Sequence, residues 1–432
     1  MKDLFTSFLS TGAIQVANLV TGILAARLLL PEGRGELAFL LLWPALIADM
    51  GALGVNTAAS YHTARRSFSP ERIFAGTAVI VAVLSPVLMG IFALLMPVLF
   101  ADYRADLILV GAIFLVFIPV HLGSHCLISQ LQGAQEFTLC NLLRAVLPYA
   151  YLVFVLLCVW LFEASPENFA YAFLGANVVA FAAGLLFAGR RGWISLRASR
   201  EVVRALLSYG ARFHVSMLLA IANRRLDLIL ITLVLPPAQL GLYVVATAVQ
   251  GLPMLVASTM DILVFPKIAA GADEAERQAV LARYLRATLI LVVPATIVLL
   301  VIAQWLVRVV FGEAFAGATD VVRILLVAGL PFTFKTLASS YFRAGNRMAV
   351  VSKAEMIGMI VSAAALFALV PAFGIVGAAI AQVFAFLVPA AYILLRARID
   401  LRLDLLSLVR FDGEDAILLR DAMRRLTRGR TA

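Results

Sequence analysis

Long apolar stretches recur along the whole chain, separated by short segments that contain polar residues, Pro or Gly. Each stretch is long enough to cross a hydrocarbon core roughly 30 Å thick as an α-helix. The stretches lack the alternation of apolar and polar residues that marks barrel strands. The pattern predicts an all-α integral membrane protein of about twelve transmembrane helices. The predicted ranges are 8–30, 37–61, 74–100, 107–131, 138–162, 168–189, 208–235, 241–267, 284–307, 318–342, 351–371 and 374–396.

Composition excludes a soluble fold, because 63% of the residues are hydrophobic and only 14% are charged. A soluble domain of this length could not bury so much apolar surface. The cysteines form no CxxC pair. His121 and His125 share a helix face at i,i+4, a spacing that can bind metal, but hydrogen-bonded polar residues are the more common case. We therefore assign no metal and no cofactor from the sequence.

The formal net charge of +10 comes from Lys and Arg that gather in alternate short loops and in the tail. Positive loops stay on the cytoplasmic side, so both termini are predicted to be cytoplasmic, in a bacterial inner membrane. Charge placed in this way fits anionic lipid headgroups better than nucleic acid, which we exclude as a partner.

An Arg-rich interruption divides the spans into six and six. The predicted parts are an N-terminal lobe at 1–189, an amphipathic cytoplasmic linker at 190–207, a C-terminal lobe at 208–397 and a basic tail at 398–432. Pro31-x-x-x-Gly35 before the second span is echoed by Pro237-x-x-x-Gly241 before the eighth. Duplicated lobes are typical of transporters, since two similar lobes can move about a site held between them.

Motifs in the same order along the chain carry a resemblance to a known family. Leu369–Ala381 is similar to the P-x-aromatic-G-x-x-GAA-x-A passage of Wzx-type oligosaccharide flippases and polysaccharide exporters, within the multidrug/oligosaccharidyl-lipid/polysaccharide (MOP) superfamily. Further agreements are Ala26–Leu28 with Pro31 and Gly35, Asp49–Gly51, Gln132–Gly133 with Phe137 and Asn141, and Arg225–Asp227 with Leu240–Tyr243 and Ala246. The resemblance implies a MATE-like fold, with two six-helix lobes around a central cavity. Twelve spans rather than fourteen favour the polysaccharide branch over the lipid II branch.

Charged residues within spans are candidates for the transport site, because a charge at the bilayer centre costs roughly 2.5–3.5 kcal/mol. Arg224 and Arg225 lie about midway along the seventh span. Arg144 in the fifth span and Lys335 in the tenth lie only about two turns from the cytoplasmic ends of their spans. All four are candidate ligands for the phosphate or pyrophosphate of a lipid-linked cargo. The alternative is structural: Arg224 neutralises Asp227 at i,i+3, and Arg225 pairs with Asp49.

Buried carboxylates within the spans are candidates for a different role, the binding of a coupling proton or sodium ion. The candidates are Asp49, Asp227 and Asp261, of which Asp261 has a local pairing with Lys267 as its simpler explanation. In the related fold, helices one, two, seven and eight line the cavity. The resemblance therefore makes five polar residues candidates for hydrogen bonds to sugars, although packing between helices is the more common role for such residues. They are Gln15, Asn18, Asn56, Asn223 and Gln250.

These features predict a transporter, not an enzyme, that flips a lipid-linked oligosaccharide from the cytoplasmic to the periplasmic leaflet by alternating access coupled to an ion gradient. Its expected partners are the lipid-linked substrate, membrane lipids and, through the tail, glycan-assembly proteins. The first alternative is a multidrug or cation antiporter of the related branch, which the basic deep residues disfavour. The second is a membrane-embedded glycan polymerase or ligase, which the short outer loops disfavour.

Overall fold

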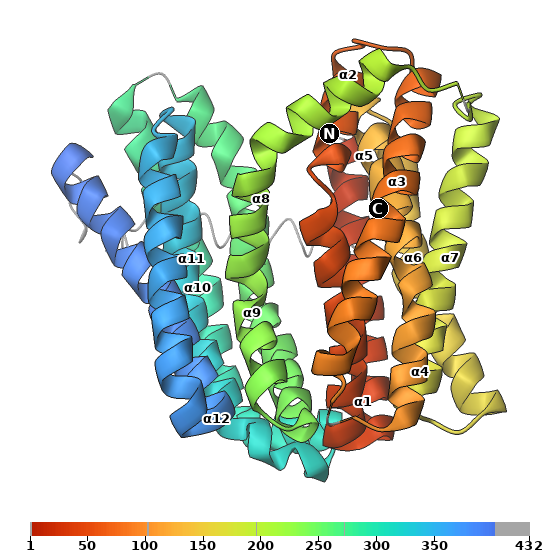
Figure 1. Ribbon diagram of the computed structural model, residues 1–432. Coiled ribbons are helices and arrows are strands. Elements are labelled where there is room, and N and C mark those ends of the chain that lie inside the picture. The colour runs from red at the N-terminus through yellow and green to blue at the C-terminus, as the bar shows by residue number, and fades with distance from the viewer. Residues whose placement is uncertain (1, 102, 196, 272, 402–432) are drawn as a thin grey trace, which may run out of the picture. The chain divides into compact units, whose positions relative to one another are not determined.

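The computed structural model describes residues 2–101, 103–195, 197–271 and 273–401, and within these ranges the regular secondary structure is entirely helical (Figure 1). Nine helices in these ranges are long and apolar enough to cross a membrane. Two of them, α1 and α12, each contain an internal break, and the more polar α8 is a further long helix. With α1 and α12 divided at their breaks and α8 added, the helices correspond to the twelve predicted spans.

The chain divides into two compact units, between Gly241 and Leu242. The first unit contains eight α-helices, a 3₁₀ turn and the start of α9. They are α1 (Lys2–Gly51), α2 (Val55–Ala64), α3 (Pro70–Leu99), α4 (Ala105–Ile113), η1 (Phe114–Val116), α5 (Phe117–Gly133), α6 (Phe137–Leu161), α7 (Pro166–Arg190) and α8 (Arg200–Val234).

The second unit contains most of α9 and the helices that follow it. They are α9 (Pro237–Ala270), α10 (Glu274–Leu306), η2 (Val307–Phe311), η3 (Glu313–Ala318), α11 (Thr319–Ala344) and α12 (Met348–Leu401). Within this unit α11 packs against both α10 and α12. Leu337, Tyr341 and Phe342 of α11 belong to its buried core.

Two helix breaks replace loops between consecutive spans. Leu30 has φ 58° and ψ 178°, and Pro31 follows it. A residue before Pro is disfavoured in the α region, so the chain turns here and the second span begins at Pro31, earlier than the predicted residue 37. In α12 the break lies at Gly374, with φ 57° and ψ −137°, a conformation that favours glycine.

The later part of the segment predicted as an amphipathic linker, from Arg200 to residue 207, is the first part of α8 and is continuous with the span. Val202 and Leu206 are buried, whereas Arg204 on the opposite side is exposed. The buried pair packs in a core with Val55 of α2 and Ile73 of α3. In Figure 1 this part of α8 runs across one end of the first unit before the helix turns along the bundle. Its apolar face is therefore covered by protein.

The two Pro-x-x-x-Gly motifs contact each other reciprocally within the first unit. A Cβ atom on Gly35 would collide with the carbonyl oxygen of Pro237, and a Cβ atom on Gly241 would collide with the carbonyl oxygen of Pro31. The atoms in the way are backbone, which cannot swing aside as a side chain can. Glycine at both positions thus permits the close approach of the two helices.

This crossing predicts that Gly35→Ala destabilises the protein. We expect its free energy of unfolding to fall by about 2–3 kcal/mol, at the upper end of overpacking effects, because the methyl group meets backbone. The measurement is the thermal unfolding midpoint of the purified protein in detergent. Gly90→Ala is the control, since a Cβ there has no neighbour within 4 Å. Equal midpoints for the two variants would contradict the interpretation.

Candidate functional site

A polar cluster in the first unit joins the end of α1 to α5. Nε2 of His121 lies 2.9 Å from Oδ1 of Asp49, close enough for the ring N–H to donate a hydrogen bond to the carboxylate. The ring of His125 lies one turn further along α5, with its centroid 4.2 Å from that of His121. The Asp49 and His121 side chains are 36% and 14% exposed. Asp49 therefore has a specific partner inside the bundle.

This partner differs from the one that the structural alternative assigned to Asp49. The hydrogen bond of its carboxylate goes to His121, whereas Arg225 is only near enough to act on it electrostatically. Arg144 of α6 acts in the same way on His125. The cluster thus has two cations in its surroundings, and both were candidate phosphate ligands.

The seventh-span cations are accessible on α8. Arg224 and Arg225 are both exposed, and among the side chains that the structure describes neither forms an ion pair or a hydrogen bond. Oδ1 of Asp227 accepts a hydrogen bond of 2.8 Å from the Leu228 N–H. Arg144 is also exposed and donates to Oε1 of Gln132 over 3.4 Å. These guanidinium groups are therefore available to a ligand.

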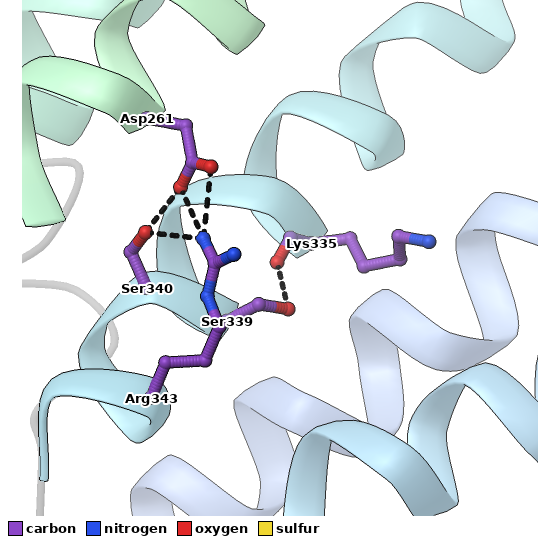
Figure 2. Close-up of polar contacts among 5 residues, drawn as sticks. All are labelled: Asp261, Lys335, Ser339, Ser340 and Arg343. Atoms are coloured by element: carbon purple, nitrogen blue, oxygen red, sulfur yellow. Dashed lines mark hydrogen bonds and ion pairs between the residues drawn. The ribbon is translucent and has the colours of Figure 1, made fainter. Parts of the chain in front are cut away.

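The second unit pairs its span charges more fully. Nη2 of Arg343 lies 2.7 and 2.8 Å from the two carboxylate oxygens of Asp261, and it also contacts the Ser340 hydroxyl, which donates to Asp261 (Figure 2). The Asp261 side chain is 19% exposed. The expected local pairing of Asp261 with Lys267 is therefore wrong. Lys267 lies instead over the ring of Tyr284 and contacts its hydroxyl.

Lys335 points away from the Asp261–Arg343 pair, although all three residues lie in the same region (Figure 2). Its ammonium group lies 2.7 Å from Oε1 of Glu355 on α12. The Lys335 side chain is 12% exposed, so this ion pair compensates a mostly buried charge. A phosphate at Lys335 would have to compete with that carboxylate.

The five polar candidates lie in different environments. Gln15 and Asn18 are exposed on α1, Asn223 is half-buried on α8, and Gln250 is buried on α9. Asn56 of α2 is half-buried and lines a small pocket with Asp49, His121 and His125. Its side-chain oxygen accepts a hydrogen bond of 2.8 Å from the Thr57 N–H. Asn56 is therefore the member of this group that the structure brings to the Asp49 cluster.

Sequence reasoning missed the partners of the charged residues. His121, Arg343 and Glu355 come from other helices, at separations of 72, 82 and 20 residues from Asp49, Asp261 and Lys335. The i,i+4 spacing of His121 and His125 was the signal that pointed to this face of α5.

Comparison with solved structures establishes the fold. An inward-facing multidrug-resistance MATE transporter of the MOP superfamily matches with a TM-score of 0.73 at 14% identity, over 90% of this chain and 94% of that one. The lipid II flippase MurJ, in an inward closed conformation, matches with a TM-score of 0.76 at 13% identity, over 96% and 91%. The chain is a multi-pass membrane protein with the MOP fold, as predicted.

The sequence then establishes the family. The profile of the polysaccharide biosynthesis protein family matches residues 23–320, and the chain belongs to this family. A probable low-salt glycan biosynthesis flippase of Haloferax volcanii, Agl15, is 25% identical over 225 residues, or 51% of this chain. The match spans only 47% of that relative. The family match confirms the resemblance to the polysaccharide exporters of the Wzx type, and the transport activity stays a prediction.

Proposed function

We propose that this protein flips a lipid-linked oligosaccharide from the cytoplasmic to the outer leaflet of the cytoplasmic membrane, by alternating access coupled to an ion gradient. The family, the flippase relative and the fold of MurJ support a cargo of this class. The observation that carries the proposal is the exposed Arg224–Arg225 pair in the second half of α8.

Two adjacent arginines suit the charged part of such a cargo. A polyprenyl phosphate or pyrophosphate must leave water, and its charge then needs compensation. Guanidinium groups remain charged and can bind phosphate oxygens in bidentate fashion. Arg144, exposed near the same cluster, can provide a further contact. Lys335 is less suitable because Glu355 already neutralises it.

A multidrug or cation antiporter is the alternative that the MATE fold brings forward. A cationic drug would require carboxylates free to receive it. Asp261 is bound by Arg343, and the pocket at Asp49 has a volume of only ≈ 10 Å³, which can hold a small ion but not a drug. The exposed span charges near Asp49 are cations, which favours an anionic cargo. The surroundings of these two carboxylates therefore do not favour the antiporter.

Substitution of Arg225 tests the phosphate-binding role. We expect Arg225→Ala to reduce glycan export by roughly ten- to a hundredfold, since a hydrogen bond to a charged group contributes about 1.5–3 kcal/mol. Export is measured as lipid-linked glycan reaching the outer leaflet, and membrane accumulation of the protein is measured in parallel. Arg190→Ala, an exposed arginine at the end of α7, is the control. Unchanged export, or loss of the protein from the membrane, would contradict the proposal.

Ion coupling is assigned to Asp49, since Asp261 is fixed by Arg343. Asp49→Asn keeps the size of the side chain and a hydrogen-bond acceptor for His121, but it removes the negative charge that binds a cation. We therefore expect it to stop gradient-driven export while cargo binding by the purified protein persists. Full export by Asp49→Asn would exclude this role. Loss of folding that Arg225→Ala partly restores would instead identify a structural charge pair.

The proposed orientation places Met1, the 189–207 segment and Ala432 in the cytoplasm, although Met1 and 402–432 lie outside the described residues. Arg104, on the side predicted to be outer, is neutralised by Glu36 and Glu167, at 3.2 Å each. Arg72 and Glu201 pair at the predicted inner ends. Reporter fusions at Asp102 and Pro166 should then read as external. A cytoplasmic signal at either position would overturn the topology.

A further inference from the structure

Three side chains of the first unit carry donor atoms suited to one metal ion. Asp49 offers a carboxylate oxygen, and His121 and His125 each offer a ring nitrogen, all within 4.8 Å of one another. Two histidines at i,i+4 on α5 face one carboxylate at the end of α1. The sequence displayed only the two histidines as a pair, and the fold supplies the third ligand.

We propose that Asp49, His121 and His125 form a binding site for a divalent transition-metal ion of the Zn²⁺ class. Two imidazoles and one carboxylate are ligands intermediate between hard and soft, and such ligands suit these ions. Three protein ligands also leave a fourth coordination position for water. Mg²⁺ and Ca²⁺ prefer all-oxygen ligands, so the set discriminates against them. Zinc lies about 2.0–2.2 Å from N and O ligands, so the ligand atoms of a tetrahedral site are about 3.4 Å apart. Donor separations of up to 4.8 Å therefore need to shorten by roughly 1.4 Å or less, and the 2.9 Å separation between His121 and Asp49 needs to lengthen slightly.

The surroundings allow this movement. His125 is exposed, and its side chain is not fixed by a hydrogen bond to Asp49 as that of His121 is. The three ligands line a cavity of ≈ 10 Å³, which has space for about one water molecule or ion. Its other walls include Ile80, Leu84 and Val55, an apolar shell that limits the water around the ligands.

The bound ion would replace the direct contact between His121 Nε2 and Asp49 Oδ1. That hydrogen bond, at 2.9 Å, already orients the ring and the carboxylate toward each other. Two nearby cations oppose a dication, since Arg144 acts on His125 and Arg225 acts on Asp49. Removing one of these charges should therefore tighten binding, an effect that a merely structural hydrogen bond would not predict.

The test measures metal binding by the purified, tag-free protein in detergent, without cargo or ion gradient, so its outcome is independent of transport. Zn²⁺ is titrated by calorimetry, and Co²⁺ serves as a spectroscopic substitute whose visible absorption reports ligation. We expect one ion per chain, with no comparable binding of Mg²⁺. His125→Gln should weaken binding by at least about tenfold, the lower limit for losing even an outer-shell partner. Arg144→Gln should strengthen it.

The controls separate ligation from folding. His121→Gln retains a hydrogen-bond donor for Asp49 while removing the imidazole, so the variant should fold and yet bind metal weakly. His62→Gln, which replaces a histidine packed among Tyr61, Phe68 and Tyr209, should bind like the unmodified protein. Equal affinity in His125→Gln, or no bound Zn²⁺ in the unmodified protein, would overturn the proposal and leave Asp49 and His121 as a hydrogen-bonded pair.

Discussion

Hydrocarbon offers no hydrogen-bond partner, and this property of the solvent determines how the chain can be built. Each backbone N–H and C=O within a span must be satisfied by the span itself, which only helices achieve in a single segment. The chain accordingly changes direction at Leu30 and Gly374 within nearly continuous helices. Packing between helices then depends on small residues, as where Gly54 meets Gly210 and Gly133 meets Ser60.

The same constraint sorts the charged side chains into two groups. Asp261 with Arg343 and Lys335 with Glu355 are pairs from different helices that compensate each other. Such pairs hold helices in register and leave little charge for a ligand. Arg224 and Arg225 belong to the second group, because the described side chains give them no ion pair. Charges of this second group need water or a ligand, which is the physical reason to place transport chemistry on α8.

The extent to which the sequence predicted the structure follows from the range of each interaction. Hydropathy is a local property, so α6 begins at Phe137 and α7 at Pro166, within two residues of the predictions. Pairing is not local. Asp261 was expected to pair with Lys267, six positions away, yet its partner Arg343 is 82 residues distant. The Asp49–His121 contact likewise depends on how α1 packs against α5, which no periodicity in either segment reveals.

The crossing of Pro31–Gly35 with Pro237–Gly241 has the geometry of an isologous interface. Each motif gives a proline carbonyl to the other and receives one at its glycine, so the same surface is used twice. A shorter chain with one copy of the motif would hold all the groups needed to form this contact with a second copy of itself. The contact also restricts divergence: a side chain at either glycine would require the opposite backbone to move, so the two motifs can change only together.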